Sequence, residues 1–195
     1  MTVVFIKEAK SKGYLRLLIE SDGEKTALTV SEAEYQEAGS PAVRENLTRD
    51  SYEILLLADM RYRAKLKALN ILSYGDNSER MLMRKLRGAG IKPHVVEEVT
   101  QEMVSLGYIN SQRQIERLVI NEVKLHNYGP LKIIPKLVAK GYDKSEIKDA
   151  ISSLSERGEI DFEEARERLI NSRLPSDASE EEIKKLLYKN GYHVC

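Results

Sequence analysis

The chain has few residues of the kinds that carry redox or metal chemistry. It contains one cysteine, three histidines and no tryptophan among 195 residues. A single thiol cannot close a disulfide within the chain or build a thiolate zinc cluster. His94, His126 and His193 lie far apart and match neither H-E-x-x-H nor H-x-E spacing. We therefore expect no metal site, and we interpret each histidine as a surface or helix-capping residue.

Motifs for nucleophilic or nucleotide chemistry are also missing. The sequence has no G-x-x-x-x-G-K-[ST] phosphate loop, no G-x-G-x-x-G fingerprint and no G-x-S-x-G elbow. Cys195 is the last residue, where no fixed surroundings would activate its thiol. We expect no catalytic residue, no cofactor and no small-molecule substrate, so the chain is predicted not to be an enzyme.

Long hydrophobic runs are absent as well. The longest apolar run, residues 54–58, falls far short of the roughly 20 residues that a membrane-spanning helix needs. The start, "MTVVFIKEAKSK", lacks the apolar core of a secretory signal. We expect a cytoplasmic protein with no membrane partner.

Net charge is absent, but charge is unevenly distributed. Lys and Arg together number 31, as do Asp and Glu, so no overall charge indicates a nucleic acid or membrane partner. Residues 1–60 carry 7 basic and 11 acidic side chains, whereas residues 61–110 carry 9 basic and 5 acidic ones. Any binding surface for an acidic partner is therefore expected in residues 61–110.

A ten-residue motif occurs three times in the rest of the sequence. The copies are "LMRKLRGAGI" (82–91), "IIPKLVAKGY" (133–142) and "IKKLLYKNGY" (183–192). A fixed period of this length is typical of stacked supersecondary units. Hydrophobic spacing, with proline at helix starts and glycine at helix ends, predicts two complete three-helix units and a third that lacks its last helix.

Glycines at the ends of the predicted helices, including one in each repeated stretch, are interpreted as helix stops. Glycine adopts the left-handed conformation at the end of a helix, and the next apolar residue then folds back onto the last turn. The predicted stops are Gly90, Gly107, Gly141, Gly158 and Gly191.

The amino-terminal part has the sequence pattern of strands rather than helices. Residues 3–30 contain β-branched and aromatic clusters around an Asp22-Gly23 hairpin signal, which predicts two or three strands. Residues 31–60 would supply short helices to cover them. The predicted fold is mainly α: an elongated array of tandem three-helix repeats after a small β-rich segment. The predicted parts are 1–60 (β-rich segment), 61–110 (repeat 1), 111–161 (repeat 2) and 162–195 (truncated repeat 3).

Basic residues of the first repeat form a candidate partner-binding surface. Arg80, Arg84 and Arg87 follow i, i+4, i+7 spacing, which places them on one face of a helix. Lys85 flanks this stripe, and Arg61 and Arg63 lie on the preceding predicted helix. The pattern favours a solvated helix face, and the alternative is a surface for an acidic protein or a phosphate backbone.

Four stretches, taken in order, resemble the RecX family of regulatory proteins. They are "KALNILSYGDNSERMLMRKLRGAGI" (67–91), "VVEEVTQEMVSLGYIN" (95–110), "LHNYGPLKIIPKLVAKGY" (125–142) and "EEARERLINS" (163–172), followed by "IKKLLYKNGY". The resemblance implies tandem three-helix repeats that lie in the groove of a RecA filament on single-stranded DNA. It also implies inhibition of the ATPase, strand-exchange and coprotease activities of RecA. We expect a monomer with at most weak or indirect DNA contact.

Two other functions stay open at this point. A basic three-helix unit could be a helix-turn-helix-like DNA-binding module, although its middle helix, "MLMRKL", is largely core-forming. A helical-repeat scaffold for an unrelated acidic protein is the other alternative. The missing last helix of the third repeat departs from the family pattern.

Overall fold

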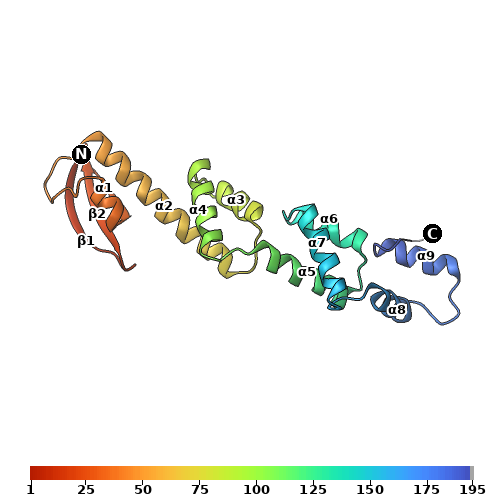
Figure 1. The fold of residues 1–195 in the computed structure, drawn as a ribbon. Coiled ribbons are helices and arrows are strands. Elements are labelled where there is room, and N and C mark those ends of the chain that lie inside the picture. The colour runs from red at the N-terminus through yellow and green to blue at the C-terminus, as the bar shows by residue number, and fades with distance from the viewer. Residues whose placement is uncertain (194–195) are drawn as a thin grey trace. The chain divides into compact units, whose positions relative to one another are not determined.

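The structure is a computed structural model that describes residues 1–193, so Cys195 lies outside the described residues. It begins with an antiparallel sheet in the order β1-β2-β3 (Figure 1). The strands are β1 (Thr2–Glu8), β2 (Tyr14–Ser21) and β3 (Glu24–Ser31). Asp22 and Gly23 form the β2–β3 turn with φ of 50° and 83°. The predicted hairpin is confirmed.

Two helices cover one face of this sheet. Leu17, Ile19, Leu28 and Val30 are buried in one cluster with Leu55 of the long helix α2. The helices are α1 (Glu32–Glu37) and α2 (Arg49–Ser73). The cover supplies the apolar contact that a three-stranded sheet lacks alone.

The rest of the described chain is helical, and the predicted fold class, mainly α after a small β-rich segment, is confirmed. Within residues 1–193 nine helices follow the sheet. Those after α2 are α3 (Glu79–Gly88), α4 (Pro93–Ser105), α5 (Ser111–His126), α6 (Pro130–Ala139), α7 (Lys144–Glu156), α8 (Phe162–Arg173) and α9 (Glu180–Lys189). The repeat boundaries stay a prediction, and α2 runs across the one placed between residues 60 and 61.

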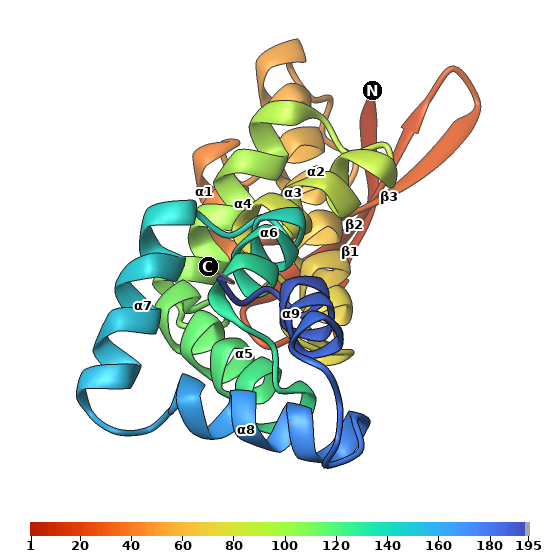
Figure 2. The ribbon, with the colours of Figure 1, turned by 90° about the vertical axis from the view of Figure 1, so that its right-hand side faces the viewer.

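The chain forms two compact units. The first comprises Met1–Tyr74 and Lys85–Glu102, and the second comprises Gly75–Arg84 and the described residues from Met103 onward. In the second unit α5, α6 and α7 form one group, and α8 lies beside α5 (Figures 1 and 2). Its core joins Ile115 and Val119 of α5 to Ile133 and Leu137 of α6 and Ile147 of α7.

Helix ends in the second unit follow the glycine pattern of the sequence. Gly141 has φ of 89°, and the amide of Tyr142 donates to the carbonyl of Leu137 at 3.3 Å. Gly191 has φ of 85°, and the amide of Tyr192 donates to the carbonyl of Leu187 at 3.1 Å. Both turns have the backward hydrogen bond of a Schellman motif.

Each of these two turns contacts the start of a preceding helix, and we call these contacts the α3–α6 joint and the α6–α9 joint. In the α3–α6 joint, Ser78 Oγ donates to the carbonyl of Lys140 at 2.7 Å. In the α6–α9 joint, the amide of Gly129 donates to the carbonyl of Asn190 at 2.8 Å, and that of Leu131 donates to the carbonyl of Gly191 at 3.1 Å. The α6–α9 joint thus supplies acceptors to amides at the start of α6, which would otherwise be unpaired, whereas the α3–α6 joint is made by the hydroxyl of Ser78.

The start of α9 is capped by its own side chains rather than by another helix. Ser179 Oγ accepts from the amide of Glu182, whose carboxylate accepts from the Ser179 amide and hydroxyl at 2.9 Å and 2.8 Å. This capping box satisfies the helix start internally. The residues at the matching position of α3 and α6, Met81 and Lys132, lack a carboxylate.

Candidate partner-binding surfaces

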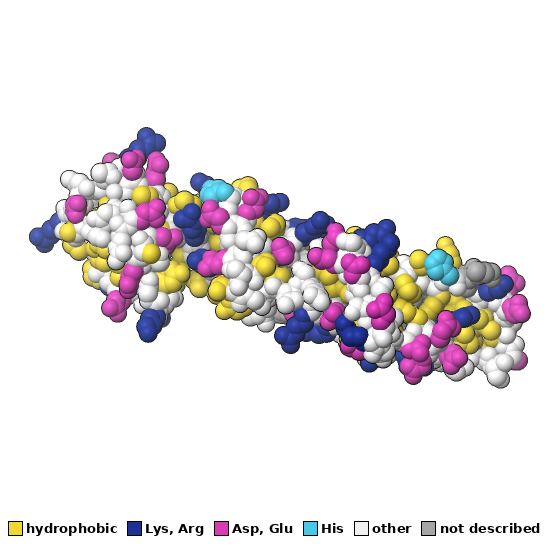
Figure 3. Space-filling view, viewed as in Figure 1, with side chains coloured by type: hydrophobic (Ala, Val, Ile, Leu, Met, Phe, Trp, Pro, Cys, Tyr) yellow, Lys and Arg dark blue, Asp and Glu magenta, His cyan; other side chains and the backbone are white. Residues whose placement is uncertain are grey.

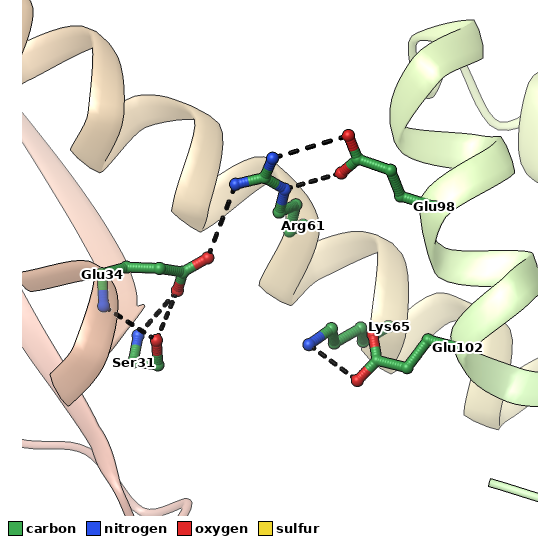
Figure 4. A network of polar contacts seen from close by, with 6 residues as sticks. All are labelled: Ser31, Glu34, Arg61, Lys65, Glu98 and Glu102. Carbon is green, nitrogen blue, oxygen red and sulfur yellow. Dashed lines mark hydrogen bonds and ion pairs between the residues drawn. The ribbon is translucent and has the colours of Figure 1, made fainter. Parts of the chain in front are cut away.

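The predicted basic residue Arg61 is engaged within the first unit (Figure 4). Its Nε lies 2.7 Å from Glu98 Oε2, and its Nη1 lies 3.8 Å from Glu34 Oε1. Glu34 also accepts from the Ser31 hydroxyl at 2.7 Å, so the network ties the cap of α1 to α2 and α4. The hydrogen bond between the two partners raises the pKa of Arg61 and lowers the pKa of Glu98. Arg61 therefore has a structural role.

Arg63 is also paired, although its side chain is more exposed. Its Nε lies 2.7 Å from Asp59 Oδ2, and its Nη2 donates to the carbonyl of Ala27 at 3.3 Å. Burial raises the pKa of Asp59, while hydrogen bonds from the Thr29 amide and from Arg63 oppose that rise. Arg63 thus neutralises a buried carboxylate beside β3.

The stripe on α3 is the more exposed set. Arg80, Arg84, Lys85 and Arg87 are all exposed. Arg87 lies 3.4 Å from Glu97, whereas the guanidinium of Arg84 contacts only Met81 Sδ, at 2.9 Å, among the described residues. Within the described residues Arg80 has no ion pair, although it helps to lower the pKa of Asp143 after the larger effect of hydrogen bonds from Ser145. Of the basic residues predicted to bind a partner, Arg80 and Arg84 on α3 are therefore exposed and without an ion pair among the described residues.

A second basic surface was missed by the sequence analysis. A groove of about 410 Å³ in the second unit is lined by the ends of α5, α8 and α9 and the start of α6. Three of its lining residues are basic, Lys132, Arg173 and Lys189, and His126 lies beside them. They stand far apart in the sequence, so no local pattern could reveal them. We call this surface the α5–α9 groove.

Metal and membrane functions gain no support from the described residues. Across residues 1–193 no three or more His, Cys, Asp or Glu side chains are grouped to hold a metal ion. None of the helices in that range is both long enough and apolar enough to cross a membrane.

A mainly helical chain, in which the end of one helix contacts the start of another and exposed basic residues gather on α3 and in the α5–α9 groove, is typical of a helical-repeat protein suited to binding a macromolecular partner. No protein-family model matches the chain. The regulatory protein RecX of Clostridioides difficile is 28% identical over 148 residues, which cover 76% of this chain and 68% of that protein. RecX of Listeria monocytogenes is 28% identical over 115 residues, and the match spans only 43% of its length.

Solved structures agree in fold. A crystal structure of regulatory protein RecX matches 98% of this chain with a TM-score of 0.74 at 20% identity. The crystal structure of RecX from Lactobacillus salivarius matches 70% of this chain and 90% of its own, with a TM-score of 0.60 at 26% identity. In sequence and in fold the chain is similar to the RecX family of regulatory proteins.

Proposed function

We propose that this chain binds the RecA filament on single-stranded DNA and inhibits its ATPase, strand-exchange and coprotease activities in the cytoplasm. The observation that carries the proposal is the similarity to regulatory proteins named RecX over 76% of the chain. The motifs set out above imply RecA as the partner of such proteins.

The surface chemistry supports a filament partner over bare duplex DNA. Basic and acidic side chains alternate over the face shown in Figure 3, in keeping with equal totals of 31 basic and 31 acidic residues. A protein that binds naked DNA tightly needs a concentrated basic face to neutralise phosphates. Several basic residues here are instead held by carboxylates, Arg61 and Lys65 among them.

The proposal is tested by titrating the chain into the single-stranded-DNA-dependent ATPase assay of RecA, with a binding curve on the same DNA without RecA. Loss of ATPase activity well below the concentration that saturates the DNA supports a filament regulator. Loss only at saturation indicates competition for DNA, and an unchanged ATPase rate would contradict the proposal.

A further inference from the structure

The α5–α9 groove is built from four segments of the second unit. His126 ends α5, Arg173 ends α8 and Lys189 ends α9, whereas Lys132 lies in the first turn of α6. The α6–α9 joint fixes two of these segments, the start of α6 and the end of α9, because the amides of Gly129 and Leu131 donate to the carbonyls of Asn190 and Gly191. The charges therefore converge on a preformed hollow rather than on separate mobile loops.

Within the described residues no ion pair neutralises the lysines and the arginine of the groove. None of the eleven residues that line it is acidic. Within residues 1–193, Lys132, Arg173 and Lys189 form no ion pair, whereas nearby Arg168 and Lys136 are paired with Glu164 and Glu122. The groove thus concentrates unpaired cations at one place on a chain without net charge.

Helix stability accounts for some of these cations but not for Lys132. A cation in the last turn of a helix interacts favourably with the helix dipole, which suits Arg173 and Lys189. Lys132 stands in the first turn of α6, where the dipole disfavours a cation. Its ammonium group is nevertheless held over the groove, 3.1 Å from Asn190 Oδ1 and 3.8 Å from the centre of the Tyr128 ring.

The aromatic ring beside the groove is already engaged. The His126 ring stacks on Tyr128 with centroids 5.4 Å apart, and Lys132 lies against the same ring. Tyr128 therefore offers no open platform on which a base could stack. Recognition in the groove must depend on the charge of the ligand rather than on its bases.

We propose that the α5–α9 groove binds the phosphate groups of a single-stranded nucleic-acid backbone. Lysine binds phosphate as a point charge, arginine adds a forked donor, and neither contact depends on base sequence. The inference goes beyond the proposed function, because it assigns a phosphate site that operates without RecA.

The test is fluorescence anisotropy of a labelled oligodeoxythymidylate, without RecA, as a function of salt. The groove variant is Lys132→Gln, Arg173→Gln, Lys189→Gln. The control variant is Arg113→Gln, Lys144→Gln, Lys148→Gln, which removes the same charges from exposed sites of the same unit outside the groove.

Each phosphate contact contributes about −0.7 to the slope of log K against log salt for single strands. Loss of three contacts should therefore make the slope shallower by about 2 in the groove variant, while the control stays close to wild type. Equal slopes in the two variants would overturn the proposal, as would tighter wild-type binding of polyglutamate than of the oligonucleotide.

Unfolding curves for both variants separate loss of the site from loss of the fold. If the groove variant is destabilised, Lys189→Gln alone serves as the second variant, since that residue is exposed and has no ion pair among the described residues. Its slope should become shallower by about 0.7, and an unchanged slope would overturn the proposal. The ATPase titration is independent of this assay, so failure of one proposal leaves the other standing.

Discussion

Replacement of Gly191 by alanine is the sharpest test of how the repeats are joined. A Cβ at Gly191 would lie 2.4 Å from the Lys132 backbone nitrogen and 2.5 Å from Lys132 Cβ. Gly191 also has φ of 85°, which a residue with a Cβ adopts only under strain. The substitution therefore strains the turn and separates the α6–α9 joint at the same time.

The two effects can be separated with a matched control. Gly90 has φ of 81° and also ends a helix, but a Cβ there would meet nothing within 4 Å. Gly90→Ala should lower the free energy of unfolding by about 1 kcal/mol, the conformational effect alone. Gly191→Ala should lower it by a further ~2 kcal/mol, from overpacking and weakened joint hydrogen bonds.

Gly129→Ala provides the complementary control. Gly129 has φ of −83°, which any residue adopts, yet a Cβ there would lie 2.3 Å from the Gly191 carbonyl oxygen. This variant should lose roughly 1 to 3 kcal/mol through contact alone.

The measurements are urea unfolding followed by far-UV circular dichroism, and amide hydrogen exchange at Gly129 and Leu131. Both amides donate across the joint, so their exchange should accelerate in Gly191→Ala and stay slow in Gly90→Ala. Equal destabilisation by Gly191→Ala and Gly90→Ala, with unchanged exchange at both amides, would show that the contact between Gly191 and Lys132 does not stabilise the fold.

Three further predictions follow from the same structure. Replacing Arg80, Arg84 and Arg87 by alanine should weaken binding to the RecA filament by about tenfold, at roughly 0.5 kcal/mol for each exposed charge. Circular dichroism should show unchanged helicity. Unchanged binding would mean that the stripe is a solvated helix face. Gly141→Val should lower the free energy of unfolding by at least ~2 kcal/mol, because Gly141 has φ of 89° and a Cβ there would lie 2.6 Å from Ser78 Oγ; unaltered urea unfolding would contradict the α3–α6 joint. The hydrogen bond from Arg61 lowers the pKa of Glu98 below its ordinary 4.5, so the ion pair stabilises the fold fully above pH 4.5 and loses this effect as the pH falls through the lowered pKa. Glu98→Gln should therefore flatten the decline of the urea midpoint at acid pH. An identical decline in both proteins would show that the pair contributes nothing to stability.

Features set by neighbouring residues could be predicted from the sequence. The helix starts at Pro130, Asp143 and Ser179 depend on proline or on a capping side chain within the first turn, and the structure has them as expected. The Asp22-Gly23 turn is equally local. Such signals need no knowledge of what the helix or strand later contacts.

Features that depend on distant residues could not be predicted. Arg61 and Glu98 stand 37 residues apart, and the spacing of basic residues gave no sign that this guanidinium is held internally. The groove joins Lys132 to Lys189 only because Gly129 and Gly191 bring two backbones together. A glycine in the sequence indicates a helix stop, but not that another helix rests against it.

The central claim is that the partner of this chain is the RecA filament rather than DNA alone. The most direct measurement is sedimentation of the chain with RecA filaments assembled on single-stranded DNA, beside the same DNA without RecA. The chain should sediment with the filament at concentrations where it leaves the bare DNA unbound. Equal or tighter association with the bare DNA would contradict it.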